Sequence, residues 1–266
     1  MVPSFKCHGS KARTAPWLVS HFPRREFRRW IEPFAGRGNV FFRAACEGHK
    51  FEEALLNDIL KASFLEALRD QKSFEFVDDG EINRDVWERW KSAPDSPEKW
   101  LAESYVARFG SSWETGPSTA GGDSMNGHSR RNTIKRMKEA QRLLQGAHIF
   151  RGDWKDFLSE VKPTEEDLVY LDPPYDVPQS VHFENIDHDD FLWTCKSLLG
   201  FIMISGYSTP RYEEALVGWN RASRERSSVG KGVASRGSSG TKPRVEEVIW
   251  WRDPKPAPDF FESLFL

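Results

Sequence analysis

The chain has 266 residues, 38% of them hydrophobic, and a formal net charge of −2 at pH 7. This length accommodates one large domain, or one domain that carries an insertion. The near-neutral charge argues against a protein that coats nucleic acid indiscriminately, and no stretch approaches the roughly 18 apolar residues that a membrane-spanning helix needs.

The start of the chain and the cysteines bear on its localisation. Residues 1–6 lack the apolar core of a secretory signal. Cys7, Cys46 and Cys195 are widely spaced and odd in number, so they form neither a disulfide framework nor a zinc-binding pattern. We therefore expect a cytoplasmic protein without a bound metal.

Short apolar or β-branched runs that end in turn residues predict buried strands, and helical spacing of apolar residues predicts helices between them. The expected strands span residues 30–34, 53–56, 148–150, 168–171, 201–205, 220–226 and 245–251. The expected helices span residues 12–21, 39–47, 60–69, 132–144 and 188–199. This alternation predicts an α/β fold with a mostly parallel seven-stranded sheet. Because only a loop joins the last two strands, we expect them to form a terminal antiparallel hairpin.

Residues 73–146 break this rhythm. A Trp-rich part is followed by a loop at residues 116–127, and long loops in compact domains are usually functional or disordered. We interpret the segment as a mostly helical inserted subdomain, which divides the main domain into residues 1–72 and 147–266. A second such loop is expected at residues 227–243, within the last hairpin.

A glycine-rich turn follows the first expected strand. Gly36 and Gly38 stand between that strand and a helix, and glycine lets the backbone approach a ligand closely because it has no Cβ. Asn57-Asp58 ends the next strand about 20 residues later, which is the usual spacing of a ribose-binding carboxylate in nucleoside sites. Asp58 is therefore expected either to bind a ribose or to cap the following helix.

Two further elements follow strands. In Gly152-Asp153-Trp154, Asp153 is placed to accept a hydrogen bond from an adenine amino group, and Trp154 either stacks on that ring or belongs to the core. The apolar strand 168–171 then delivers Asp172-Pro173-Pro174-Tyr175 at its carboxyl end. Consecutive prolines fix φ and remove backbone donors, so this turn is rigid and its carbonyls are available as acceptors.

The Asp-Pro-Pro-Tyr run suits chemistry at an exocyclic aromatic amine. Such an amine is a poor nucleophile because its lone pair is delocalised into the ring. The Asp172 carboxylate and the Pro173 carbonyl are two acceptors for its two N–H bonds, which would hold the nitrogen in place and favour a tetrahedral, nucleophilic geometry. Tyr175 supplies a face on which the base stacks.

The ordered set of motifs resembles the Dam-type family of adenine-specific DNA methyltransferases, with the cofactor motif first and the catalytic motif last, as in compact phage and prophage versions. The resemblance covers nearly the whole chain. It is carried by His8-Gly9-Ser10-Lys11, Pro16-Trp17-Leu18, Glu32-Pro33-Phe34-Ala35-Gly36-Arg37-Gly38, Asn57-Asp58, Gly152-Asp153, Asp172-Pro173-Pro174-Tyr175, Ile204-Ser205-Gly206-Tyr207 and Val245-Glu246-Glu247-Val248-Ile249-Trp250.

The resemblance implies a Rossmann-like class I methyltransferase fold that uses S-adenosylmethionine. By position, Lys11 would reach the methionine carboxylate of the cofactor near the turn from Phe34 to Gly38, and Asp58 would hold its ribose. Asp153, with Trp154 beside it, would hold the adenine, and Asp172 would touch both cofactor and target. Two residues depart from the family pattern. Cys7 replaces a common aromatic residue at one edge of the cofactor, and Ser10 replaces a usual glycine.

The insertion would then recognise double-stranded DNA. Arg130, Arg131 and Lys135 are candidates for phosphate contacts or for an arginine that reads guanine, unless they only form a solvated helix face. The mechanism implies that adenine is flipped out of the duplex, into a pocket that His182 and Phe183 would wall, unless Phe183 belongs to the core.

Three alternatives stay open. Instead of an adenine-specific DNA methyltransferase, the same motifs fit an RNA adenine or guanine amino methyltransferase, a cytosine amino methyltransferase, or a catalytically silent DNA-binding regulator on the same fold. A restriction endonuclease of the same system also remains open as a partner.

Overall fold

The computed structural model describes residues 2–5, 10–71, 127–176, 186–227 and 244–254, and these residues fall into two compact units. Unit 1 is Met1–Lys162 and unit 2 is Pro163–Leu266. The helices and strands below refer to these described ranges. Most of the predicted insertion and nearly all of both predicted loops lie outside them.

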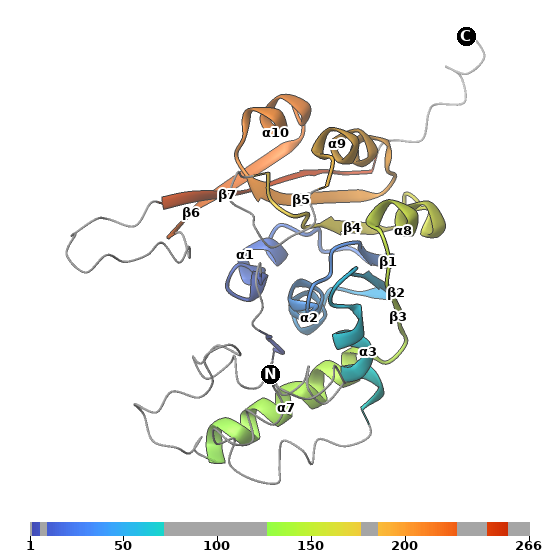
Figure 1. The fold of residues 1–266 in the computed structure, drawn as a ribbon, viewed down its shortest axis with the longest axis vertical. Coiled ribbons are helices and arrows are strands. Elements are labelled where there is room, and N and C mark those ends of the chain that lie inside the picture. The colour runs from blue at the N-terminus through green and yellow to red at the C-terminus, as the bar shows by residue number, and fades with distance from the viewer. Residues whose placement is uncertain (1, 6–9, 72–126, 177–185, 228–243, 255–266) are drawn as a thin grey trace, which may run out of the picture. The chain divides into compact units, whose positions relative to one another are not determined.

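Unit 1 contains three parallel strands in the order β3-β2-β1. Its elements in chain order are η1 (Lys11–Arg13), α1 (Ala15–Val19), β1 (Phe27–Glu32), α2 (Asn39–Cys46), β2 (Phe51–Asn57), α3 (Ala62–Asp70), α7 (Gly127–Leu144), β3 (Ala147–Phe150) and α8 (Trp154–Val161). Figure 1 shows α2 and α3 on one face of these strands and α8 on the other. Helices therefore cover both faces of these strands and bury the apolar side chains from which the strands were predicted.

The core of unit 1 is strongly aromatic. Trp30 on β1 is buried between Phe22 and Phe41, with ring centroids 5.3 and 6.2 Å away. Its indole N–H donates to the buried Glu32 carboxylate over 3.0 Å, so this polar pair is satisfied inside the core. Such packing fixes the end of β1, from which the glycine turn departs.

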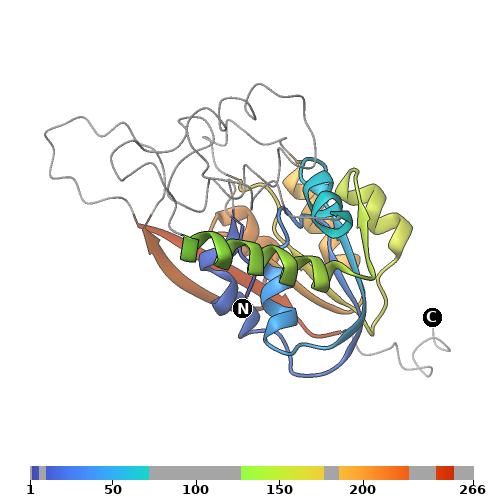
Figure 2. The same ribbon diagram turned by 90° about the horizontal axis from the view of Figure 1, so that it is seen from below.

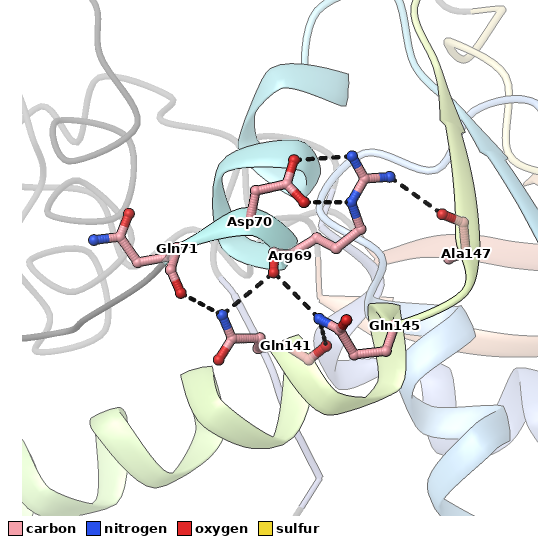
Figure 3. A network of polar contacts seen from close by, with 6 residues as sticks. All are labelled: Arg69, Asp70, Gln71, Gln141, Gln145 and Ala147. Carbon is pink, nitrogen blue, oxygen red and sulfur yellow. Dashed lines mark hydrogen bonds and ion pairs between the residues drawn. The ribbon is translucent and has the colours of Figure 1, made fainter.

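Helix α7 is fastened to the end of α3 by side-chain amides (Figure 3). The Gln141 amide donates to the carbonyls of Arg69 and Gln71 over 3.3 and 2.6 Å, and the Gln145 amide donates to the Arg69 carbonyl over 3.3 Å. The Arg69 guanidinium in turn binds Asp70 and donates to the Ala147 carbonyl. The last carbonyls of a helix lack partners within it, so these amides satisfy the end of α3 and hold α7 beside it (Figure 2).

Unit 2 contains four strands in the order β4-β5-β7-β6. Its elements are β4 (Leu168–Leu171), α9 (His188–Ser197), β5 (Phe201–Tyr207), α10 (Pro210–Ala215), β6 (Asn220–Ser227) and β7 (Arg244–Arg252). Strands β4 and β5 are parallel, whereas β7 is antiparallel to both β5 and β6. Helices α9 and α10 lie on the same face of this sheet (Figure 1).

A glycine is required where β5 begins. Gly200 has φ +95°, and a Cβ there would lie 2.6 Å from the carbonyl oxygen of Asp167 and 2.7 Å from that of Thr164. Any other residue would combine strain with a backbone clash. This close approach brings the start of β5 beside the start of β4.

The predicted fold class is confirmed: the structure has a seven-stranded, mostly parallel α/β sheet with an antiparallel hairpin at its end. All seven predicted strands and four of the five predicted helices are present within a few residues. The predicted insertion boundaries at residues 73 and 146 stay predictions, although α7 confirms the helix expected at residues 132–144 and extends it to Gly127.

Proline accounts for two differences from the predicted elements. The helix expected over residues 12–21 is instead the short η1 followed by α1, because Pro16 lacks an N–H and is accommodated only in the first turn of a helix. The first strand ends at Glu32 rather than Phe34, since Pro33 cannot donate to the ladder. Helices α8 and α10 were not predicted.

Candidate active site

The glycine turn follows β1 in unit 1. Gly36 and Gly38 both have left-handed backbones, with φ +55° and +72°. The turn is closed by backbone bonds from Ala35 to the Asn57 carbonyl and from Gly38 to the Ala35 carbonyl, each 2.8 Å long. A Cβ at Gly36 would meet no atom of the described residues within 4 Å apart from its chain neighbours, whereas one at Gly38 would lie 3.0 Å from the Phe42 ring. Gly36 therefore borders open space, and Gly38 packs against α2.

Asp58 joins this turn to the start of α3. One carboxylate oxygen accepts from the Gly36 amide over 2.8 Å. The other accepts from the amides of Leu60 and Lys61 over 2.9 and 2.6 Å. The Asp58 carboxylate thus fixes both the glycine turn and the turn that leads into α3, but it does not cap that helix, whose N-cap residue is Lys61 without a side-chain cap. A ribose contact by the same half-exposed carboxylate stays a prediction.

Asn57 is a positioning residue whose role was not predicted. Its buried side-chain amide donates to the carbonyls of Pro33 and Gly152 over 2.9 and 3.1 Å, and its oxygen accepts from the Gly152 amide over 3.1 Å. One side chain thereby ties together the chain segments that leave β1, β2 and β3. A polar residue that ends an apolar strand was the available signal.

Asp153 and Trp154 begin α8. The Asp153 carboxylate caps the helix by accepting from the amides of Lys155 and Asp156 over 2.7 and 3.4 Å. Trp154 is 7% exposed, and its ring centroid lies 6.0 Å from that of Phe34 in the glycine turn. The structure thus brings Phe34 and Trp154 together, and contact of Asp153 or Trp154 with an adenine stays a prediction.

The N-terminal segment is bound to the start of α2. The Asn39 side chain bonds both backbone groups of Phe5, over 2.8 and 2.9 Å. Ser10 donates to the Phe5 carbonyl over 3.1 Å and accepts from Asn39 over 3.1 Å, so its hydroxyl has partners that a glycine would lack. Lys11 follows in η1 and is 4% exposed. Cys7 lies outside the described residues.

In unit 2, Asp172 directly follows β4. Its Oδ1 accepts from the Ser205 hydroxyl over 2.9 Å, and that hydroxyl also lies 2.9 Å from the Tyr170 hydroxyl. Pro173 is buried and Asp172 is half-buried. The carboxylate is therefore held at the end of a buried strand and partly open to solvent.

The Tyr175 ring packs against Tyr207 from the end of β5, with centroids 4.2 Å apart and planes inclined by 52°. Burial raises the pKa of the Tyr175 phenol well above its usual value, and the charges of Asp172 and Glu247 raise it further. Tyr175 accordingly stays neutral at physiological pH. This state suits a stacking surface rather than a proton acceptor.

Polar contacts hold the chain beyond Tyr175. The Arg211 guanidinium lies 3.5 Å from the Asp176 carboxylate and 3.3 Å from that of Asp189. The buried His188 ring and the Tyr212 hydroxyl are 2.8 Å apart. Burial lowers the pKa of His188 from its usual 6.5, so the ring is neutral near pH 7. These contacts join α9 to α10 and were not predicted.

The candidate DNA-binding residues lie on α7. Lys135 is exposed, whereas the side chains of Arg130 and Arg131 lie outside the described part of the chain, as do His182 and Phe183. Among the described residues, no group of three His, Cys, Asp or Glu side chains is arranged to hold a metal ion. No helix in the described ranges is long and apolar enough to cross a membrane.

Residues 8–79 match the family model of the D12 class N6 adenine-specific DNA methyltransferases. This match confirms the predicted family resemblance in the segment that carries Lys11, Gly36, Gly38 and Asp58, and it identifies the chain as a methyltransferase. No curated protein sequence matches the chain.

Solved structures resemble the chain at low sequence identity. The Escherichia coli protein yhhF, to which methyltransferase activity is ascribed, is 13% identical, with 96% of this chain and 92% of that one covered and a TM-score of 0.36. A Pyrococcus horikoshii protein to which RNA methyltransferase activity is ascribed is 11% identical, with 96% and 88% covered and a TM-score of 0.44. A SAM-dependent O-methyltransferase from Thermotoga maritima is 11% identical, with 92% and 67% covered and a TM-score of 0.38. Similarities this low carry no argument about substrate or partner.

Proposed function

We propose that this chain transfers a methyl group from S-adenosylmethionine to the exocyclic amino group of adenine in double-stranded DNA. The observation that carries the proposal is the Asp172 carboxylate in its Asp-Pro-Pro-Tyr turn, anchored by Ser205 at the end of the buried strand β4. The family match over residues 8–79 supports adenine in DNA as the acceptor.

The residues of the turn would act on the target amine as acceptors and as a stacking surface. The Asp172 carboxylate and the Pro173 carbonyl would accept the two N–H bonds of the amine, which orients its lone pair toward the methyl donor. A preorganised acceptor also stabilises the positive charge that develops on the nitrogen during the transfer. Neutral Tyr175 would stack on the base.

The donor set in unit 1 fits S-adenosylmethionine, which when bound supplies an activated methyl group on a sulfonium. Within the part of the chain that the structure describes, only chain neighbours lie within 4 Å of the Cβ position at Gly36, so the left-handed turn leaves room for a ligand against the backbone. Phe34 and Trp154 would bound the cofactor on one side, with Lys11 for its carboxylate. Asp58 would hold the ribose and Asp153 the adenine.

Further residues proposed for the cofactor are Cys7 at its edge, Gly38 in the turn and Asp172 near its methyl group. Asp58 and Asp153 already accept backbone hydrogen bonds. A carboxylate has about four acceptor positions, so both retain capacity for a ligand hydroxyl or amine. Because the same two carboxylates would bind both the protein backbone and the cofactor, cofactor binding would be coupled to the order of the glycine turn and of α8.

DNA binding would involve the basic part of α7. Lys135 is exposed on this helix, and Arg130 and Arg131 precede it by one turn or slightly more. Phosphate contacts of this kind position a protein without reading sequence. The adenine amine is paired inside the duplex, so the reaction requires the base to be flipped out. A restriction endonuclease of the same system is an additional, independent proposal.

An acceptor assay tests this function. Purified protein and radiolabelled S-adenosylmethionine would be incubated with unmethylated genomic duplex DNA and, separately, with structured RNA, and both products digested to nucleosides. We expect N6-methyldeoxyadenosine from the DNA alone. Methylation of RNA alone, or of cytosine in DNA, would refute the proposed acceptor, and no S-adenosylmethionine binding would indicate a silent regulator.

A further inference from the structure

Two buried hydroxyls stand behind the Asp172 carboxylate. Tyr170 and Ser205 are both 0% exposed, and their oxygens are 2.9 Å apart. Ser205 donates to Asp172 Oδ1 over a further 2.9 Å. The hydroxyls therefore form a chain of hydrogen bonds that ends on the half-buried carboxylate.

The direction of this chain follows from the number of protons. An ionised carboxylate only accepts, and a serine hydroxyl has one proton to donate. Because Ser205 gives that proton to Asp172, the Tyr170 phenol must be the donor in its contact with Ser205. Each hydroxyl is thus oriented by the next, and a hydrogen bond to an ionised group is the stronger kind.

The strand register sets the geometry of this chain. In the parallel pair of β4 and β5, Tyr170 lies opposite Met203 and Leu171 lies opposite Ile204. Tyr170 lies in β4 two residues before Asp172, which directly follows the strand, and Ser205 contacts both side chains. Ser205 follows Ile204 on the neighbouring strand and lies beside the point at which β4 ends. The two hydroxyls are therefore carried by rigid strands, not by loops.

We propose that Ser205, itself oriented by Tyr170, is a positioning residue that fixes the rotation of the Asp172 carboxylate toward the target amine. This inference rests on the proposed methyl transfer. Without the Ser205 donor, the carboxylate loses a hydrogen bond that restrains rotation about its Cβ–Cγ bond, so its acceptor positions match the two N–H bonds less well. Small misalignment of a reacting group lowers the rate of the chemical step and leaves substrate binding largely unchanged.

The alternative is that the hydroxyls merely satisfy each other inside the core. The two explanations differ in what a substitution changes. A core role predicts loss of stability with normal turnover by the folded fraction. A positioning role predicts slower turnover by folded protein, with cofactor and nucleic-acid binding retained.

The test compares Ser205→Ala, Tyr170→Phe and the double variant with wild type. Tyr212→Phe is the matched control, since it also removes a buried phenol hydroxyl in unit 2, one that contacts His188 instead. Single-turnover rates would be measured on whichever acceptor wild type methylates, duplex DNA or structured RNA, together with S-adenosylmethionine dissociation constants and urea unfolding curves.

We expect the single-turnover rate to fall about 10- to 100-fold in Ser205→Ala, the range for loss of a hydrogen bond to a charged group, with the cofactor dissociation constant changed less than about twofold. Tyr170→Phe should slow the reaction less and have little further effect in the Ser205→Ala background, since the two residues act in series. Ser205→Thr, which keeps the hydroxyl, should turn over faster than Ser205→Ala.

Outcomes separate this inference from the function beneath it. If the wild-type protein methylates RNA alone, the proposed acceptor is refuted, but the single-turnover rates measured on RNA still test the positioning role. A wild-type rate in folded Ser205→Ala overturns the positioning role whichever acceptor is used. Additive effects of the two substitutions on rate and on unfolding would show that the hydroxyls are not coupled, and would overturn the chain of hydrogen bonds itself.

Discussion

Replacing Gly36 by alanine tests whether the glycine turn holds the cofactor. Gly36 has φ +55°, and among the described residues beyond its chain neighbours none has an atom within 4 Å of the position that its Cβ would take. The cost to folding is therefore backbone strain alone, about 1–2 kcal/mol for a left-handed non-glycine residue. For a chain of this size that lowers the melting temperature by about 2–4 °C per kcal/mol.

The effect on ligand binding should be much larger. If the cofactor lies against this turn, the new methyl group is forced into it, and overpacking of that kind costs about 1–3 kcal/mol. With tenfold per roughly 1.4 kcal/mol, the S-adenosylmethionine dissociation constant should rise about 5- to 150-fold. Isothermal titration calorimetry measures this constant directly.

Gly48→Ala is the matched control. Gly48 has φ +83° and equally open surroundings, but it precedes β2, at the opposite end of that strand from Asp58. The melting temperature should fall by a similar amount in both variants, while only Gly36→Ala should bind S-adenosylmethionine more weakly. Equal, wild-type affinity in both variants would refute the assignment of this turn as the cofactor cradle.

Three further predictions concern catalysis, DNA binding and acid stability. Asp172→Ala should lower the rate of methyl transfer at saturating S-adenosylmethionine by at least about 10²–10³-fold, as for other single preorganised groups; wild-type turnover in a radiolabel-transfer assay would remove Asp172 from the reaction. The double variant Arg130→Ala, Arg131→Ala should weaken DNA binding and flatten its dependence on salt concentration in fluorescence anisotropy, because fewer counterions are released; an unchanged salt slope would place both side chains off the DNA. Burial lowers the pKa of His188 from 6.5, so the unfolded chain binds the extra proton first and stability should fall as the pH drops below about 6.5. In His188→Gln, the free energy of unfolding measured in urea should decline less steeply with falling pH over that range than in the wild type. An equally steep decline would exclude His188 as its source.

Much of the fold follows from local patterns in the sequence. The four-residue apolar run Leu168–Leu171 appears as a strand with unchanged bounds. Helix α8 was missed because Asp153 was considered as a ligand contact and Trp154 as a stacking or core residue. Asp153 as a capping residue and apolar side chains at Trp154, Phe157 and Leu158 nevertheless form a helical pattern. Helix α10 is only six residues long and offered little periodicity.

The site was predicted as separate elements, and its connections were not. That Asp58 reaches back to the Gly36 amide depends on how two strand ends meet, which spacing alone does not determine. The contacts of Asn57 with Pro33 and Gly152 depend on the order of three neighbouring strands. Such side-chain ties form only once the register is set, so residue type indicated the chemistry and packing supplied the partners.

The most direct measurement of the central claim is single-molecule mapping of methylated bases in the DNA of methylation-deficient cells that express the wild-type protein or Asp172→Ala. We predict N6-methyladenine at a defined set of sequence contexts with the wild type, and none with the variant at equal expression. The absence of N6-methyladenine from the DNA of cells that express the wild type would contradict the proposed function. As much N6-methyladenine with Asp172→Ala as with the wild type would contradict the role of Asp172.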